Sequence, residues 1–524
     1  MAKAKTAAKP AAAASVSPAA NEQKYLSMKE WILYLVAVFF YTTMTGMINE
    51  YRKAYLVDIL LLSEGAMSFF NTFTGIAGFV LSFVYAMILD NKKPKNGNKF
   101  KHLGLIFAIP CGVITALIFY IPDFIAQNPT VLLIYICALA LIQGLCFYFG
   151  NTINMVAVVM TPNSREREQL LSFRGISSAV GNSAPLVIVL VVGLIIKAVQ
   201  GAENNALNYL ISSVLCSILG TVTVLLAMSV VKERITYKVE KKNPLHGFWI
   251  VLKNKHARIV LISEFLKGFR GVSTFMQPFI AAAMLGSSSQ TLLFALPVGV
   301  GTMVGMLIIN ALLKNFNSRV LYIASGFYSV IVNCIAFGVG CLYLNTGKSW
   351  LNIIFIACLF LTGIQFGASN LLPSMFKADI LDDMELSTGK RLDAGIEFVI
   401  GLGGTVSGII ASGVVPYILY GDHSIIGYNQ GLEDGTMQTL RTKILLLFFY
   451  TVVHGIMMLL AGVPFFFYKL TGKEKERVHN ELMARRDAME EVLTENGTVE
   501  IDIEANPTDK ETQPEAKQKT SKKK

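Results

Sequence analysis

Long apolar segments recur along almost the whole chain, and they constrain its fold more than any other feature. A helix needs roughly 20 mostly apolar residues to cross about 30 Å of hydrocarbon. Twelve such segments lie near Trp31–Val57, Met67–Leu89, Leu103–Ile121, Val131–Met160, Gly175–Val199, Tyr209–Val231, Ile259–Leu285, Leu292–Leu313, Val320–Leu344, Leu351–Met375, Gly395–Tyr420 and Ile444–Phe467. Backbone groups cannot stay unpaired in lipid, and the short alternating segments of a transmembrane barrel are absent. We therefore predict an all-α membrane protein with twelve transmembrane helices.

The composition agrees with a bilayer environment and argues against several other classes of protein. Hydrophobic residues make up 53% of the chain and charged residues 15%, which is too apolar for a water-soluble protein of this size. The formal net charge of +11 resides mainly in short loops and tails, where it indicates membrane orientation rather than nucleic-acid binding. All seven cysteines lie inside predicted spans, and no catalytic triad order or phosphate loop has a suitable context. We expect no disulfide, metal site, cofactor, nucleic-acid partner or enzymatic activity.

A polar segment, residues 232–258, divides the predicted spans into two sets of six. We predict a disordered cytoplasmic tail over residues 1–24, six-helix bundles over 25–231 and 259–468, a cytoplasmic helix over 469–493 and a disordered tail over 494–524. Two six-helix bundles facing a midplane cavity are typical of the major facilitator superfamily. We expect such a chain to act as a monomer in the lipid bilayer.

The distribution of basic residues predicts the orientation of the chain in the membrane. Twenty Lys and Arg residues of the loops fall on one side of the predicted spans and six on the other, and the six include Arg52 and Lys53. Basic loops stay preferentially in the cytoplasm. We therefore predict a multi-pass protein of the plasma membrane whose central loop and both termini are cytoplasmic.

Two predicted cytoplasmic segments resemble those of a known transporter family. The chain reads SREREQLLSFR from Ser164 to Arg174, after the fourth span, and ADILDDMELSTGKR from Ala378 to Arg391, after the tenth. Both resemble signatures of the glycoside-pentoside-hexuronide:cation symporter family, and the resemblance covers roughly Trp31 to Arg486. It implies a secondary active transporter of a glycoside, oligosaccharide or uronide that couples to a proton or sodium and works by alternating access.

Charged and amide side chains inside the spans are the candidate substrate ligands. Glu264, Lys267 and Arg270 follow one another at steps of three on the seventh span, so they share one helix face, and Arg270 lies near mid-membrane. Its guanidinium suits paired oxygens, although an internal Glu264–Lys267 ion pair that merely lines the cavity is an alternative. Arg174 contributes to the sugar site by the resemblance, or anchors a helix end. The expected substrate-binding set is Tyr41, Thr45, Asn49, Asn151, Asn154, Arg174, Lys267, Arg270, Gln277, Gln365 and Asn370.

The resemblance fails at the cation site. Sodium-coupled relatives keep two acids on the second helix, where this chain has Gly78 and Ser82, and the positions that bind galactosides in the family fall on Thr42 and Gly150. A proton on Glu50, Glu264 or Glu397 is therefore the better hypothesis for coupling. Charged residues at cytoplasmic helix ends are expected to gate the transporter through salt bridges between the bundles. These are Asp90, Arg165, Arg167, Asp379, Asp382, Asp383 and Arg391.

Other interpretations stay open at this point. Lipid-moving relatives share the fold, so a carrier of lysolipids or other amphiphiles is an alternative, as is a non-transporting sensor that signals through the tail Gly472–Leu493. The glycine runs Gly299–Gly305 and Gly401–Gly408 lie inside apolar spans, where they favour close helix packing over nucleotide binding. A histidine inside the last span, His454, is more often a packed core residue than a proton relay.

Overall fold

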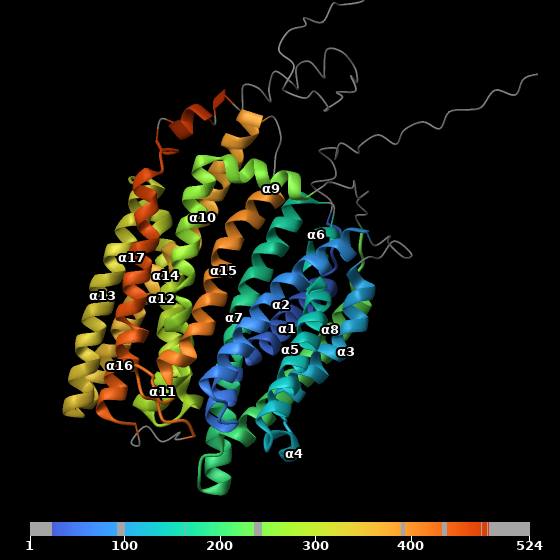
Figure 1. The fold of residues 1–524 in the computed structure, drawn as a ribbon. Coiled ribbons are helices and arrows are strands. Elements are labelled where there is room, and N and C mark those ends of the chain that lie inside the picture. The colour runs from blue at the N-terminus through green and yellow to red at the C-terminus, as the bar shows by residue number, and fades with distance from the viewer. Residues whose placement is uncertain are drawn as a thin grey trace, which may run out of the picture.

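The computed structural model describes residues 24–91, 100–161, 163–234, 244–388, 393–431, 438–472, 474–478 and 480–481. Over these ranges the chain forms two helical bundles that stand side by side, the first in blue to teal and the second in green to red (Figure 1). The first bundle comprises α1 (Met28–Ala54), η2 (Tyr55–Ile59), α2 (Glu64–Asn91), α3 (Phe100–Ile118), α4 (Asp123–Ala126), α5 (Pro129–Gly150), α6 (Thr152–Met160), α7 (Ser164–Gln200) and α8 (Asn205–Val230).

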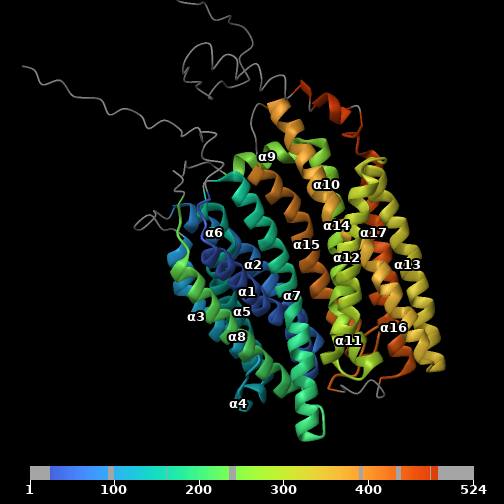
Figure 2. The same ribbon diagram turned by 180° about the vertical axis from the view of Figure 1, so that it is seen from behind.

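The second bundle follows a short connecting helix, α9 (Pro244–Lys253), which lies across one end of the molecule (Figure 1). It comprises α10 (Lys255–Gly268), α11 (Gly271–Leu285), η3 (Ser288–Thr291), α12 (Leu292–Leu312), α13 (Ser318–Thr346), α14 (Ser349–Thr388), α15 (Asp393–Leu419), α16 (Leu440–Tyr450), α17 (Val452–Gly462) and η5 (Val463–Phe467). We call the end that carries α9 the α9 end, and the other the far end. Figure 2 shows α7 and α12 on the opposite face, where the bundles meet.

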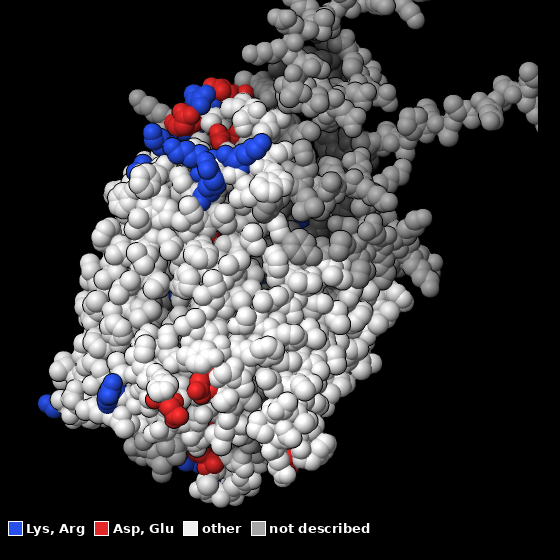
Figure 3. Space-filling view, in the orientation of Figure 1, with Lys and Arg blue, Asp and Glu red and all other residues white. Residues whose placement is uncertain are grey.

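Each predicted span corresponds to one helix or to two or three consecutive helical elements. Ten helical segments of the described ranges are long and apolar enough to cross a membrane, and α2 and the α10–α11 pair account for the other two predicted spans. Figure 3 shows Lys, Arg, Asp and Glu gathered at the two ends of the visible face, with a broad uncharged band between them. A band of this kind is what a bilayer requires.

Polar residues placed just before the apolar segments start several helices. Ser27 and Glu30 form a capping box at α1, in which each side chain accepts a hydrogen bond from the other residue's backbone N–H. Asn128 and Asn254 accept backbone N–H groups at the starts of α5 and α10. At the other end of α11, Gly286 takes a left-handed φ of 93°, which turns the chain into η3.

Glycines let α12 and α14 approach closely, as predicted for the first glycine run. A Cβ on Gly301 would overlap the carbonyl oxygen of Phe360, and one on Gly363 would overlap that of Val298. In the second run, a Cβ on Gly403 would lie 2.6 Å from the Leu261 carbonyl oxygen. Small residues at these positions bring backbones together, which favours van der Waals packing between membrane helices.

The bundles are joined by hydrogen bonds in the half of the molecule away from α9. Among the described residues, every polar contact recorded between the bundles lies in this half. The pairs are Lys53–Thr274, Ser68–Gly413, Asn71–Ser412, Asn205–Ser287, Tyr209–Ser288, Asp58–Tyr428 and Gln430 with both Val57 and Leu62. The bundles are therefore closed against each other at the far end.

Several helix boundaries differ from the sequence prediction because charged residues continue the helices beyond the apolar segments. The predicted tenth span ends at Met375, whereas α14 runs to Thr388 and contains Ala378–Thr388 of the second signature segment as helix. The predicted fifth span starts at Gly175, whereas α7 starts at Ser164 and contains the first signature segment. The predicted loop 232–258 contains α9 and the start of α10. The tails 1–23 and 482–524 and residue Arg391 lie outside the described residues, and so do the side chains of Asp90 and Arg165.

Candidate functional site

Two adjoining cavities lie between the bundles. The first, of about 380 Å³, is lined by α1, α2, α10, α11 and α15, and thus by both halves of the chain. The second, of about 640 Å³, is lined by α1, α2, α5, α6 and α15. Arg52, Asn71, Gly404 and Ser412 belong to the lining of both. A chamber shared by two bundles is where a transporter of this architecture binds its solute.

The first cavity is strongly cationic. Arg52 and Lys53 line it from α1, and Lys267 and Arg270 line it from the seventh predicted span; Glu264 is the one acidic residue of the described lining. Lys267 Nζ donates to Glu264 Oε1 at 2.5 Å. The predicted ion pair is therefore present, and it leaves three cations without a carboxylate among the lining residues. Such an arrangement attracts an anion, since desolvated like charges repel one another.

Arg270 sits where the seventh span is interrupted. The chain breaks between α10 and α11 at Phe269–Arg270, and the Arg270 N–H donates to the Lys267 carbonyl in a tight turn. The guanidinium lies 4.5 Å from the ring centre of Phe366, a cation–π contact, and its buried Nη1 has no hydrogen-bond acceptor. Interrupted membrane helices commonly form substrate sites. The unsatisfied donor is therefore available to a ligand oxygen.

Arg52 and Lys53 are site residues that the sequence analysis missed. Arg52 Nη1 donates to Gln143 Oε1 at 2.8 Å, and its guanidinium lies 5.3 Å from the Phe70 ring centre. Lys53 Nζ donates to the Thr274 carbonyl across the bundle interface at 3.0 Å. Both were counted as residues of the external side, although they fall inside the predicted span Trp31–Val57. Their position within an apolar segment was the signal that could have identified them.

The second cavity gathers neutral polar groups. It is lined by Tyr41, Thr45, Asn151 and Asn154, all predicted substrate-binding residues. Tyr41 Oη donates to the Phe147 carbonyl at 3.0 Å, and Asn154 Nδ2 donates to Asn151 Oδ1 at 2.7 Å. Hydroxyl and amide groups of this kind match sugar hydroxyls, which both donate and accept.

Asn49 and Arg174 also lie at or beside the cavities. Asn49 is exposed in the lining of the first cavity. Arg174 is outside both linings, but its Nη1 donates to the Asn154 carbonyl at 2.6 Å and so holds the backbone beneath the second cavity. This hydrogen bond joins α7 to the first turn of α6.

Besides Arg174, three more predicted substrate ligands lie outside both cavities. Gln365 is buried in the second bundle, where it donates to Ser369 Oγ at 2.6 Å and its Oε1 lies 3.4 Å from His454 Nε2. Gln277 is half-buried on α11 and Asn370 is exposed on α14, and neither belongs to a cavity lining. Helix rotation decides which face of a span meets a cavity, and a role of these three residues in substrate binding stays a prediction.

The three candidate coupling acids are separated by the structure. Glu264 lines the first cavity, whereas Glu50 and Glu397 line neither. Glu397 is 68% exposed and pairs with Lys377 at 2.7 Å. Only Glu264 is in a position to contact a solute in the cavities.

Two of the predicted gating residues contact partners within their own bundle. Asp379 is buried and accepts from Lys475 at 2.7 Å, and Asp383 accepts from Asn254 Nδ2 at 2.9 Å. Asp382 also lies on the last turns of α14, and Arg167 is half-buried on the first turn of α7. The contacts of Asp379 and Asp383 lie within the second bundle, and the gating role of the whole set stays a prediction.

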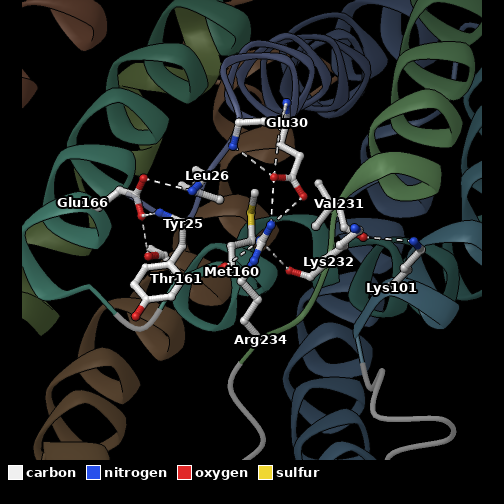
Figure 4. Close-up of polar contacts among 11 residues, drawn as sticks. Tyr25, Leu26, Glu30, Lys101, Met160, Thr161, Glu166, Val231, Lys232 and Arg234 are labelled. Atoms are coloured by element: carbon white, nitrogen blue, oxygen red, sulfur yellow. Dashed lines mark hydrogen bonds and ion pairs between the residues drawn. The ribbon is translucent and has the colours of Figure 1, made fainter. Parts of the chain in front are cut away.

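A polar cluster beside Arg167 holds the α9 end of the first bundle together (Figure 4). Glu166 accepts from the backbone N–H groups of Tyr25 and Leu26 and from Thr161 Oγ1. Arg234, after α8, pairs with buried Glu30 at 3.0 Å and donates to the Met160 carbonyl at 2.9 Å. Arg234 thus fastens the start of the central connection to α1 and α6.

Comparison with known proteins places this architecture in a family. A family model described as MFS/sugar transport protein matches residues 33–472. The chain belongs to this MFS/sugar transport family. The match covers both bundles and both cavities. Membership in the family confirms the predicted major facilitator fold with its two bundles, the assignment to sugar transporters and the prediction that the chain is not an enzyme.

Individual relatives of the MFS/sugar transport family are distant but match over nearly their whole length. "Putative glycoside/cation symporter YagG" of Escherichia coli K12 is 24% identical over 456 residues, covering 85% of this chain and 92% of the relative. "Putative sulfoquinovose importer" of Salmonella typhimurium LT2 is 23% identical over 478 residues, with 90% and 92% covered. The solved structure of the nucleoside transporter NupG superimposes with a TM-score of 0.58 at 12% identity, covering 84% of this chain and all of that one. That likeness supports the fold alone.

Proposed function

We propose that this chain is a cation-coupled transporter of an anionic glycoside, such as a uronide or a sulfosugar. The observation that carries the proposal is the charge of the first cavity, where Arg52, Lys53, Lys267 and Arg270 surround a single carboxylate. An uncharged sugar would leave this excess of half-buried cations uncompensated, which costs free energy in a low-dielectric site. The names of two relatives, a glycoside/cation symporter and a sulfoquinovose importer, support the same substrate class.

The two cavities divide the recognition of such a solute between them. The anionic group would bind Arg270 and Lys267, because a guanidinium fork suits a carboxylate or sulfonate. The sugar ring would extend toward Tyr41, Asn151 and Asn154 of the second cavity. Arg52 lines both cavities, so it would contact the anionic group and the ring together.

The hydrogen bonds that close the bundles against each other at the far end support an inward-facing state. Basic residues predict that the α9 end is cytoplasmic, and polar contacts between the bundles lie in the opposite half, as with Asn205–Ser287 and Asp58–Tyr428. Alternating access would break these contacts and form new ones at the α9 end. We propose that the chain does this as a monomer in the plasma membrane with both termini in the cytoplasm.

A pair of ligands that differ only in charge tests the proposed substrate class. Binding of phenyl β-D-glucuronide and of phenyl β-D-glucoside to the purified protein is measured by calorimetry, with methyl sulfoquinovoside and methyl glucoside as a second pair. One charge-assisted hydrogen bond adds about 1.5–3 kcal/mol, so the anionic member should bind roughly 10 to 100 times more tightly. Equal or weaker binding of both anionic ligands would overturn the proposal. Tight binding of lysophosphatidylglycerol alone would favour the amphiphile carrier.

A further inference from the structure

The first cavity holds a single acid that is already bound to one of its cations, and this suggests how transport is coupled. We propose that Glu264 gives up Lys267 to the anionic group of the solute and takes up a proton in its place, so that one proton moves with each solute. This inference rests on the proposed function, because it requires an anionic solute. Of the three acids that the sequence analysis predicted as proton carriers, this inference assigns the role to Glu264, which lines the first cavity.

Two cations on the same helical segment differ in whether they already have a partner. Arg270 Nη1 is buried without an acceptor, whereas Lys267 Nζ lies 2.5 Å from Glu264 Oε1. An entering carboxylate or sulfonate can bind Arg270 at once. To gain Lys267 as well, it must compete with Glu264 for the ammonium group.

Losing Lys267 to an anion changes the electrostatic surroundings of Glu264. Its carboxylate would then stand beside a second negative charge without its closest counter-ion, and desolvation also disfavours the charged form. Binding a proton removes both penalties. Because binding and protonation are linked, the solute must bind more tightly where protons are available, and protons must bind more readily where the solute is present.

The other charged and titratable groups near Glu264 do not replace Lys267. Arg270, which follows α10, would be bound by the solute, and the Tyr322 hydroxyl on α13 lies 3.4 Å from Ser263 Oγ. Lys377 on α14 is paired with Glu397 of α15 at 2.7 Å. Across the cavity, Lys53 on α1 donates to the Thr274 carbonyl and Arg52 donates to Gln143. Each of these cations is already occupied by another partner or by the solute itself.

The composition of the cavity also favours a proton over sodium. A sodium ion needs several oxygen ligands, and the described lining of the two cavities has one carboxylate beside four cations. The two second-helix positions that hold acids in sodium-coupled relatives are Gly78 and Ser82. Here the Gly78 carbonyl accepts from Tyr148, and Ser82 Oγ donates to the Phe79 carbonyl. A proton needs only the oxygen of Glu264.

The proposed exchange also predicts the charge carried per cycle. The carboxylate of Glu264 becomes a neutral acid by taking one proton from solution, and the solute brings one negative charge to Lys267 and Arg270. The net charge of solute plus proton is zero. Uptake of a monoanionic glycoside should therefore be driven by a pH gradient and insensitive to membrane voltage.

The test measures solute binding and proton uptake in the same sodium-free sample. Phenyl β-D-glucuronide is added to purified protein in weakly buffered solution containing pyranine, and binding is followed in parallel by calorimetry from pH 5 to 8. For wild type we expect proton uptake on binding. The affinity for the glucuronide should weaken by up to tenfold for each unit by which the pH rises. Glu264→Gln should bind without proton uptake and without this pH dependence. Glu397→Gln, which alters an acid outside the cavities, should behave as wild type.

The outcomes separate this inference from the proposed function. Binding by wild type without proton uptake, or proton uptake that persists in Glu264→Gln, would overturn the coupling inference and leave an anionic substrate intact. No binding of either anionic ligand by wild type would overturn the proposed function, and this inference with it. The pH dependence of wild-type affinity remains a test even if Glu264→Gln does not fold.

Discussion

A hydrogen bond from Lys53 to Thr274 joins the two bundles at a point where a helix of the second bundle lacks one of its backbone hydrogen bonds. Pro278 has no N–H, so the Thr274 carbonyl four residues earlier on α11 has no backbone donor. Lys53 Nζ, on the last turn of α1, donates to that carbonyl at 3.0 Å. A proline in the second bundle thus creates an acceptor for a lysine of the first, in the half of the molecule where the bundles are closed.

Replacing Lys53 should weaken this closure. Lys53→Met removes the donor to Thr274 and should cost about 1 kcal/mol of stability, measured by thermal unfolding of the purified protein. Pro278→Ala restores a backbone donor, so Lys53→Met should cost less in that background. Lys197→Met, which removes an exposed lysine paired with Glu203, serves as the control. An equal cost of Lys53→Met in both backgrounds would contradict the proposed role of Pro278.

Two glycines of one run should respond differently to the same substitution. A Cβ on Gly301 would overlap the Phe360 carbonyl of α14, whereas a Cβ on Gly299 meets no atom within 4 Å. Gly301→Ala should therefore push α12 and α14 apart and cost about 1–3 kcal/mol. Gly299→Ala should leave the melting temperature unchanged or raise it slightly, because alanine favours helix. Equal effects of the two substitutions would rule out close packing as the reason for Gly301.

The spans could be predicted from the sequence because membrane thickness sets their length. An apolar run of roughly 20 residues is a local signal that needs no tertiary information. The same signal explains why the end of α14 was misplaced. Its apolar part stops near Met375, but nothing prevents a charged segment from continuing as helix in water up to Thr388. Hydropathy reports where lipid ends and not where a helix ends.

The site could be predicted only in part. Lys267 and Arg270 stood out because a charge inside an apolar segment is expensive unless it meets water, a partner or a ligand. Gln365 looked equivalent to Asn151 in sequence, yet it bonds Ser369 inside the second bundle while Asn151 lines a cavity. An amide is tolerated in both settings, and the rotation of the helix that decides between them depends on packing across the fold.

Arg270 should discriminate between charged and uncharged ligands. Its Nη1 lacks an acceptor, whereas Arg52 Nη1 is bound to Gln143. Arg270→Lys keeps the charge but loses the planar fork, so the affinity for phenyl β-D-glucuronide should fall roughly tenfold, with little change for the glucoside. Arg52→Lys should have a smaller effect on the difference between the two ligands. A parallel loss of both ligands in Arg270→Lys would indicate a packing role against Phe366 instead.

The chain after η5 should stabilise the second bundle through Asp379. The Asp379 carboxylate is 7% exposed and accepts from Lys475 at 2.7 Å, while Val478 belongs to the hydrophobic core of the second bundle, as Phe376 does. Lys475→Met leaves a buried carboxylate without its partner and, since Lys475 is itself 45% exposed, should cost about 1–2 kcal/mol.

Arg477 supplies the matched control for Lys475, because its ion pairs among the described residues are with Glu474 and Glu481 at the surface of the same segment. Arg477→Met should leave the melting temperature unchanged. Adding Asp379→Asn to Lys475→Met should recover much of the lost stability, since the remaining amide no longer carries a buried charge. If the double variant is no more stable than Lys475→Met alone, the lysine acts through its aliphatic packing rather than through the ion pair. In that case Asp379, which belongs to the second signature segment, would be available for another partner when the α9 end closes.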